Sequence, residues 1–267
     1  METSRSYVRF AALGDSATYG IGDRASHRFR GWARLLRDAI ATDHDVSFCN
    51  FARPGATAAD LRNSQLGDAL EHRPQLASLI VGLNDTMRSA WDPKKLRSDL
   101  LHSANSLAEQ GATLMTVRFH DHSRVFGVPR PLGGPLRQRI DLLNDVYEEI
   151  HATHSGLQVD LGQHPRVYDR EFWSFDRLHP SELGHRALAH EFSALLEEHG
   201  LTFESPALEL DGDPTTWVGE LRSFVIEGVP WMARRVRDLG PSLGRGALHK
   251  ARRGSPTSPR DVQPLGS

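Results

Sequence analysis

Apolar runs that suit buried strands alternate with helical segments five times along this chain. Residues 32–40 show the helical pattern, with Trp32, Leu36 and Ile40 on one face. Continuous apolar runs separated by such helices are typical of a doubly wound parallel sheet between two helical layers. We therefore expect an α/β fold, a three-layer α/β/α sandwich with a five-stranded parallel sheet. The predicted strands are 7–13, 46–52, 76–81, 113–119 and 157–161. The segment that contains Pro131 and Gly133 is expected to be a loop, followed by a long helix over about 136–154.

The composition is that of an ordinary globular protein, with 25% charged and 39% hydrophobic residues. Its 267 residues suffice for one sizeable α/β core and an appendage. The formal net charge of -2 gives no reason to expect a nucleic-acid partner. The single cysteine, Cys49, excludes an internal disulfide, and its place in a predicted strand indicates an inert core thiol.

The amino-terminal residues lead straight into the first predicted strand, without the apolar core of a signal peptide. No apolar run approaches the roughly 18 residues that a membrane-spanning helix requires. We therefore expect a cytoplasmic protein.

The first predicted strand ends in Gly14-Asp15-Ser16, and Gly20 and Gly22 follow closely. Glycine at 14 allows a turn, and the two later glycines keep the next loop open. Ligands of open α/β sheets bind at the carboxyl ends of the strands, which is where Ser16 lies. Ser16 either caps a helix or acts as a nucleophile. The second interpretation requires a base, a group that orients the base, and donors for an oxyanion.

The second and third predicted strands run into turns that contain Gly55 and Asn84. Parallel strands place these turns at the same sheet edge as Ser16. Gly55 has no side chain, so its N–H can approach a substrate oxygen closely, and Asn84 offers an uncharged amide donor. With the N–H of Ser16 they form a candidate oxyanion hole, in which losing one donor costs on the order of 3 kcal/mol of barrier.

Asp176 and His179 are three residues apart and are followed by Pro180, which we expect to open the last helix. At this spacing the carboxylate can fix the imidazole tautomer and leave the other ring nitrogen for Ser16. Ser16, Asp176 and His179 are therefore the candidate catalytic residues.

Four segments of the chain resemble, in order and spacing, the motifs of the SGNH hydrolases, the GDSL-type esterases and lipases. They are GDSATYGIGD at 14–23, NFARPGATAADL at 50–61, GLND at 82–85 and DRLHPSELGHRALA at 176–189. The resemblance spans about residues 7–199 and implies a flavodoxin-like fold. It also implies Ser16 as nucleophile, Gly55 and Asn84 as oxyanion donors, His179 as base and Asp176 as its partner. Where the family often has Gly-Gly-Asn-Asp, this chain has Leu83 in second position and keeps Asn84.

The leading hypothesis is a serine hydrolase that cleaves a carboxylic ester through an acyl-enzyme on Ser16, without a metal or organic cofactor. Short acyl and O-acetyl esters are the expected substrates, and lysophospholipids and thioesters remain open. The alternative is a non-catalytic flavodoxin-like module that holds a phosphate or small ligand at the Gly14–Gly20 loop. That alternative has no use for Asp176 and His179. The oligomeric state is left open.

Other polar residues near these turns have a structural and a functional interpretation. Asp15 and Asp85 are expected to hold their own loops through bonds from side chain to backbone, rather than to act in catalysis. His120-Asp121-His122 is expected to be a polar loop rather than a metal site, because no third ligand is evident.

The sequence defines the residues of the substrate pocket less clearly than the catalytic residues. The loop at 120–122, together with Phe126 and Tyr19, can shape the pocket for the acyl or alcohol group. Arg53 and Arg177 are expected to be solvated, the alternative being contact with an anionic substrate. His185 is expected to be a structural histidine.

Beyond Gly200 the pattern changes, so residues 1–200 are predicted as the hydrolase domain, 201–240 as a linker and amphipathic helix, and 241–267 as a basic, disordered tail. We expect the helix at 217–239 to dock on the enzyme's own surface or on a second copy. The alternative is peripheral contact with an anionic membrane. Its apolar stripe consists of Trp217, Leu221, Phe224, Val225, Met232, Val236 and Leu239.

Overall fold

The central sheet has five parallel strands in a computed structural model that describes residues 5–25 and 28–211. The strands lie in the order β4-β1-β5-β6-β7, which is the flavodoxin-like arrangement of second, first, third, fourth and fifth strand. The predicted fold class is confirmed. The strands are β1 (Tyr7–Gly14), β4 (Asp45–Asn50), β5 (Leu76–Ile80), β6 (Thr113–Arg118) and β7 (Leu157–Asp160).

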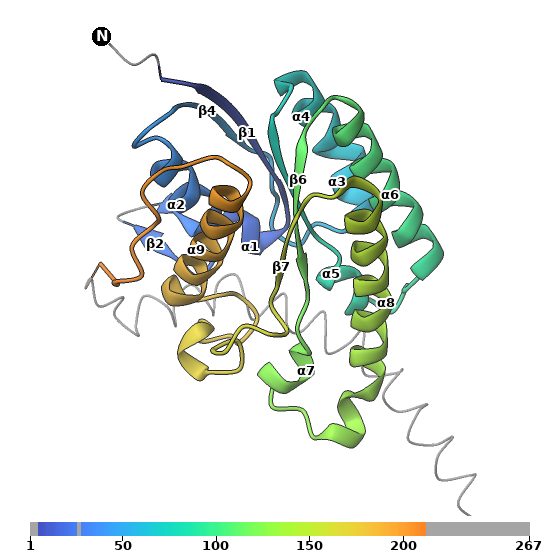
Figure 1. The fold of residues 1–267 in the computed structure, drawn as a ribbon. Coiled ribbons are helices and arrows are strands. Elements are labelled where there is room, and N and C mark those ends of the chain that lie inside the picture. The colour runs from blue at the N-terminus through green and yellow to red at the C-terminus, as the bar shows by residue number, and fades with distance from the viewer. Residues whose placement is uncertain (1–4, 26–27, 212–267) are drawn as a thin grey trace, which may run out of the picture.

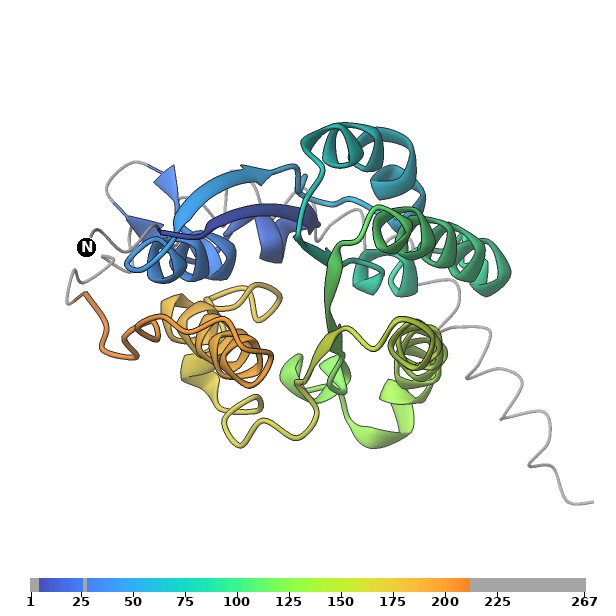
Figure 2. The ribbon, with the colours of Figure 1, turned by 45° about the horizontal axis from the view of Figure 1, so that its top comes forward.

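Helices cover both faces of this sheet (Figures 1 and 2). On one face lie α2 (Gly31–Ile40) and α9 (Glu182–Glu198), which pack against each other. The other face carries α3 (Ala58–Ser64), α4 (Leu66–His72), α6 (Pro93–Glu109) and α8 (Arg130–His154). Three short helices, α1 (Ser16–Tyr19), α5 (Leu83–Thr86) and α7 (His122–Val125), follow β1, β5 and β6 at their carboxyl ends.

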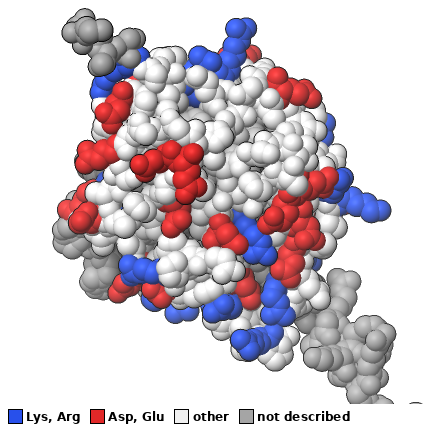
Figure 3. All heavy atoms as spheres, viewed as in Figure 1, with Lys and Arg blue, Asp and Glu red and all other residues white. Residues whose placement is uncertain are grey.

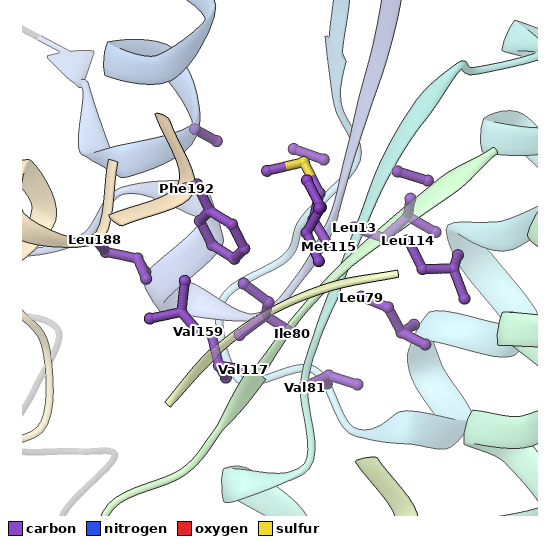
Figure 4. Packing of buried hydrophobic residues seen from close by; sticks show 14 of the residues in the cluster. Leu13, Leu79, Ile80, Val81, Leu114, Met115, Val117, Val159, Leu188 and Phe192 are labelled. Carbon is purple, nitrogen blue, oxygen red and sulfur yellow. The ribbon is translucent and has the colours of Figure 1, made fainter. Parts of the chain in front are cut away.

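The alternation of side chains along each strand sends apolar groups into both helical layers. In Figure 4, Met115 and Val159 point toward Leu188 and Phe192 of α9, whereas Leu114 points to the opposite face. All five of these side chains are buried. Because both faces of the sheet are covered, the apolar runs in the sequence are continuous rather than alternating.

Two helix boundaries differ from those predicted. The segment expected as a loop around Pro131 and Gly133 belongs to α8, which begins at Arg130. Proline is tolerated there because N–H groups in the first turn of a helix have no intrahelical acceptor. The last helix begins at Glu182 with Ser181 as its N-cap, so Pro180 does not open it. Instead Pro180 forms an isolated β-bridge with Trp173.

The loop after α1 contains a short antiparallel pair that the sequence did not predict. It joins β2 (Arg24–Ala25) to β3 (Arg28–Phe29). A 3-10 turn, η1 (Arg170–Phe172), precedes the loop that carries Asp176 and His179.

Residues 201–211, predicted as part of a linker, pack back onto the domain. Arg186 of α9 donates to the carbonyl of Ala207 at 2.9 Å and pairs with Asp211 at 2.7 Å. Phe203 packs against the hydrophobic core. The predicted helix at 217–239 and the basic tail at 241–267 lie outside the described residues.

On the face shown in Figure 3, acidic and basic side chains are interspersed. Neighbouring helices are joined by ion pairs such as that of Arg97 of α6 with Glu149 of α8. Among the described residues, no helix has the length and apolar character that crossing a membrane demands.

Candidate active site

Ser16 is the first residue of α1, directly after the end of β1. Asp15 is the N-cap of this helix and accepts a hydrogen bond from the N–H of Ala17 at 3.0 Å. The cap is therefore Asp15, and the capping interpretation of Ser16 is wrong. The close packing of this turn explains Gly14, where a Cβ would lie 2.5 Å from Thr18 Oγ1 and 2.6 Å from the carbonyl oxygen of Ile80.

Ser16, His179 and Asp176 form one hydrogen-bonded chain. His179 Nε2 lies 2.9 Å from Ser16 Oγ, although the two residues are 163 positions apart in the sequence. On the other side of the ring, His179 Nδ1 lies 2.6 Å from Asp176 Oδ2. Because a carboxylate only accepts, Nδ1 carries the proton, and in the neutral ring Nε2 is free to accept from the serine hydroxyl. The structure thus brings the three predicted residues together.

The carboxylate of Asp176 is held by several donors besides His179. Its Oδ1 accepts from Ser174 Oγ at 2.8 Å, from the N–H of Leu178 at 2.9 Å and from the N–H of His179 at 3.1 Å. Burial favours the neutral acid, but these bonds and the His179 imidazole outweigh it and hold the pKa of Asp176 well below its ordinary value. Asp176 is therefore ionised at neutral pH and can only accept in its bond with His179.

Asn84 lies between the turns that carry Ser16 and Gly55. Its Nδ2 donates to Asp15 Oδ2 at 3.3 Å and to the carbonyl of Ala56 at 3.1 Å. Each acceptor is the immediate neighbour of a predicted oxyanion donor. The structure therefore joins the three predicted donor positions through this one buried amide.

Gly55 has a φ of +77°, a conformation that L residues with a side chain rarely adopt. Its carbonyl accepts from Arg88 Nη2 at 3.1 Å, which holds the peptide between Gly55 and Ala56. Within the described ranges, the N–H groups of Ser16 and Gly55 have no hydrogen-bond acceptor. Both donors are available to a substrate oxygen.

Two carboxyl groups, those of the buried Asp15 and the partly buried Asp85, support these turns. Burial raises the pKa of Asp15 to about 6 and that of Asp85 to about 7. Asp15 holds its own loop, as predicted, through the N–H of Ala17. Asp85 differs from the prediction, because its Oδ2 accepts at 3.1 Å from the N–H of Ala58, at the start of α3, rather than from its own loop.

Some side chains bind the backbone where strands end, and the sequence did not predict these contacts. Gln65 accepts from the N–H of Gly14 and donates to its carbonyl, both at 2.9 Å. Asn144 pairs in the same way with Phe119, at 2.7 and 2.9 Å. For Asn144 the signal in the sequence is a polar residue on the apolar face of a helix, whereas Gln65 lies in the turn between α3 and α4 and has no such signal.

Tyr147 binds both backbone groups of Val81, the residue after β5, through its single hydroxyl group. The hydroxyl donates to the carbonyl of Val81 at 2.7 Å and accepts from its N–H at 3.0 Å. The ends of β1, β5 and β6 are thus each fixed by a buried side chain, from Gln65 between α3 and α4 and from Tyr147 and Asn144 of α8.

The histidines of the 120–122 segment, where the sequence predicted a polar loop, are buried. His120 is 3% exposed and His122 is fully buried, and their rings hydrogen-bond each other. Asp121 is the N-cap of α7. In the described part of the chain, no group of three His, Cys, Asp or Glu side chains is arranged to hold a metal ion.

The remaining candidates are dispersed. Arg53 is exposed, and Arg177 Nη1 donates to the carbonyl of Val125 at 3.5 Å. His185 is fully buried with both nitrogens hydrogen-bonded, one to the N–H of Trp32 and one to the carbonyl of Ile21. It is the structural histidine that the sequence predicted.

Cys49 and the two aromatic candidates are only partly buried or exposed. Cys49 is half-buried on the edge strand β4, and its Sγ lies 3.7 Å from His72 Nδ1, so it is not a core thiol. Tyr19 is 40% exposed and its ring contacts that of Phe29. Phe126 packs edge-on against His122.

Comparison with known proteins points to one family. The model of the GDSL-like lipase/acylhydrolase family matches residues 12–187. An acetylxylan esterase of Geobacillus stearothermophilus is 25% identical over 169 residues, which cover 59% of this chain and 75% of that protein.

Solved structures share the fold. A catalytic mutant of the acetylxylan esterase Axe2 from Geobacillus stearothermophilus matches with a TM-score of 0.59 at 18% identity, over 75% of this chain and 96% of that one. TesA matches with a TM-score of 0.56 at 21% identity, over 73% and 99%. The psychrotrophic esterase EstA from Pseudoalteromonas sp. matches with a TM-score of 0.57 at 15% identity, over 73% and 99%.

Proposed function

The chain belongs to the GDSL-like lipase/acylhydrolase family and is an ester hydrolase, and on this premise we propose that it works through an acyl-enzyme on Ser16. The observation that carries the proposal is the hydrogen-bonded chain from Ser16 Oγ through His179 to Asp176. A phosphate-binding module would have no need of this chain, so the non-catalytic alternative is not favoured.

In the acylation step, Ser16 Oγ attacks the ester carbonyl while His179 Nε2 takes the hydroxyl proton. The ionised Asp176 stabilises the resulting imidazolium and keeps the ring in place. When the tetrahedral intermediate collapses, His179 returns the proton to the leaving alcohol, and the acyl group remains on Ser16. Water, deprotonated by His179, then releases the carboxylic acid and restores the hydroxyl of Ser16.

The oxyanion of each tetrahedral intermediate is stabilised by the N–H groups of Ser16 and Gly55 and by the amide of Asn84. Asn84 Nδ2 already has two acceptors, of which Asp15 at 3.3 Å is the longer. An oxyanion that binds Asn84 therefore replaces Asp15 as the acceptor, because Nδ2 has only two hydrogens to donate. The buried negative charge of Asp15 makes that exchange favourable only for a strong acceptor such as the developing oxyanion.

For the substrate we propose a short acyl ester, with an O-acetyl group as the first candidate. The relative that is 25% identical is named an acetylxylan esterase, and it supports an acetyl ester of a carbohydrate. A panel of aryl acetate, butyrate and octanoate esters, followed by acetylated and deacetylated xylan, tests this part separately.

The test of the nucleophile is Ser16→Ala, compared with Ser106→Ala on α6, whose hydroxyl bonds only within its own helix. We expect Ser16→Ala to lose more than about 100-fold of the wild-type esterase rate while its melting temperature stays unchanged. A fluorophosphonate probe should label the wild type and Ser106→Ala, but not Ser16→Ala. Residual activity above roughly a hundredth of wild type would refute the assignment.

A further inference from the structure

A pair of buried histidines lies behind the catalytic turn, and the mechanism above does not use it. His122 Nε2 lies 3.0 Å from the carbonyl oxygen of Arg177, the residue next to Asp176. His122 Nδ1 lies 2.8 Å from His120 Nε2. A carbonyl only accepts, so His122 Nε2 carries a proton and donates it to this bond.

The protonation of both rings follows from this bond. Burial lowers the pKa of His122 to about 4 and holds the pKa of His120 well below its ordinary value, so both rings are neutral. His122 Nδ1 is then an acceptor and takes the proton of His120 Nε2. His120 Nδ1 is left as a bare acceptor, which agrees with its having no partner among the described residues. In this arrangement of protons, His120 Nε2 donates to His122 Nδ1, and His122 Nε2 donates to the carbonyl of Arg177.

The residue that receives this bond has an unusual backbone. Arg177 has a φ of +55°, in the left-handed region that favours glycine and that few other residues enter. A conformation of this kind persists only where surrounding contacts hold it. The carbonyl of Arg177 is fixed by His122, and its guanidinium reaches the carbonyl of Val125.

The histidine pair is itself rigidly packed. The ring centroids of His120 and His122 lie 4.8 and 4.9 Å from that of Trp173. Trp173 Nε1 donates to the carbonyl of Val167 at 2.6 Å, and Trp173 forms a β-bridge with Pro180, the residue after His179. The catalytic turn is therefore supported on both sides by contacts to one aromatic cluster.

We propose that His122 is a positioning residue, which holds the turn from Asp176 to His179 in its catalytic geometry through the Arg177 carbonyl, and that His120 fixes its tautomer. This inference rests on the proposed function. His122 is fully buried, so it cannot contact substrate, and its effect reaches Ser16 only through the placement of His179. A displacement of about 1 Å in catalytic geometry can cost around 100-fold in rate.

Substitutions of His122 separate this role from packing. His122→Phe keeps the aromatic ring without a donor. His122→Gln loses the ring but places an amide N–H near the position of Nε2, and His122→Asn has the same amide one bond shorter. If the hydrogen bond matters, His122→Gln should keep kcat within about 3-fold of wild type, while His122→Phe and His122→Asn lose about 10- to 100-fold. KM should stay within about 2-fold throughout, because the residue is remote from substrate.

The proposal is wrong if the His122 variants show the opposite order of kcat values. If the ring serves only to fill space, His122→Phe should be the most active variant and the two amides should be equally impaired. The comparison of His122→Gln with His122→Asn decides the matter even if His122→Phe does not fold. Equal activities in these two amide variants contradict a positioning hydrogen bond.

Two further readouts bear on the same point. The proton shared by His179 Nδ1 and Asp176, across 2.6 Å, should give a far-downfield proton resonance in wild type and His122→Gln that is lost in His122→Asn. Arg177→Asn places there a residue that enters the left-handed region more readily than arginine, so the loss caused by His122→Asn should be smaller in that background. If the effects of His122→Asn and Arg177→Asn on kcat are strictly additive, the two residues do not act together, which contradicts the proposal.

Labelling by the fluorophosphonate tells failure of the proposed catalytic function apart from failure of the His122 proposal. If the fluorophosphonate does not label Ser16 in the wild type, the catalytic assignment itself fails and the inference falls with it. If the wild type is labelled but the His122 variants follow the packing order, only the inference fails.

Discussion

The side-chain amide of Gln65 pairs with both backbone groups of Gly14, two residues before Ser16. Gln65 Oε1 accepts from the N–H of Gly14 and Nε2 donates to its carbonyl, each at 2.9 Å. Gln65 is fully buried. It therefore acts as a strand partner for the last residue of β1 and fixes the point from which Ser16 projects.

The first prediction is that Gln65→Leu destabilises the fold and lowers activity. The substitution leaves the buried N–H of Gly14 without the Gln65 acceptor, whereas the carbonyl of Gly14 still accepts from the N–H of Arg53 at 3.3 Å. An unsatisfied buried group costs about 1–3 kcal/mol, so we expect the free energy of unfolding, measured by urea denaturation, to fall by about 1–3 kcal/mol. Because Gly14 lies next to the Asp15 cap, kcat should fall as well.

Gln138→Leu is the matched control, since Gln138 lies exposed on α8. Its stability should change by less than about 0.5 kcal/mol. Equal unfolding midpoints for the two variants would show that the Gln65 bonds contribute nothing.

The sheet and the motif residues were predictable because their signals are local. Buried strands appear as apolar runs, and Ser16 follows directly from the strand that carries it. The side chain of Asp176 reaches His179 within three residues. The parallel topology predicted that Ser16, Gly55 and Asn84 would meet, and the resemblance to the SGNH hydrolases added Asp176 and His179. The structure places Ser16, His179 and Asp176 in hydrogen-bond contact. Their catalytic roles remain a prediction.

The supporting contacts could not be predicted because they join distant parts of the chain. Gln65 binds Gly14 across 51 positions, and His122 binds Arg177 across 55. The sequence around Gln65 and around His122 does not indicate which backbone group each side chain will bind. The start of α8 was missed for a different reason, since its first turn contains proline and glycine, which ordinarily indicate a loop.

The second prediction concerns Gly22, which lies against the residue after His179. Gly22 has a φ of +101°, and a Cβ there would lie 1.9 Å from the carbonyl oxygen of Pro180. Gly22→Ala must therefore displace either its own loop or the Pro180 segment that carries His179. We expect kcat/KM to fall by about 100-fold, consistent with a displacement of roughly 1 Å in catalytic geometry.

The control for this substitution is Gly67→Ala in α4, where a Cβ would meet nothing within 4 Å. It should leave kcat/KM unchanged and stabilise the fold by about 0.5–1 kcal/mol, because alanine is the better helix former. Unaltered activity in Gly22→Ala would mean that the close approach to Pro180 is not needed.

The third prediction is a pH dependence of stability due to Asp85. Burial raises the pKa of this carboxyl from an ordinary 3.8 to about 7 in the folded protein. Between these values the folded state holds a proton that the unfolded state has lost, so this contribution to stability falls as pH rises. The contribution is complete below about pH 4 and is lost by about pH 7.

Asp85→Asn cannot titrate and still offers an acceptor to the N–H of Ala58. The difference in unfolding free energy, wild type minus Asp85→Asn, should therefore fall by about 1.4 kcal/mol per pH unit from roughly pH 4 to 7. The difference also cancels the opposite trend of the buried histidines, whose lowered pKa values make stability rise with pH. A difference that stays constant over this pH range would contradict the prediction.

The last prediction concerns the amphipathic helix that the sequence predicts at 217–239. A truncation after Gly200 would not test it cleanly, because it also removes Phe203 from the core and Asp211 from Arg186. A chain that ends at Asp211 keeps these contacts and lacks only residues 212–267. The apolar stripe of the predicted helix can bury several hundred Å2 at roughly 25 cal/mol per Å2, so some surface must cover it. If the helix docks on the hydrolase domain, the chain ending at Asp211 should melt at a lower temperature or aggregate, measured by thermal unfolding and light scattering against full-length protein. Unchanged melting and solubility, together with lost binding to anionic liposomes, would contradict docking and support a membrane contact instead.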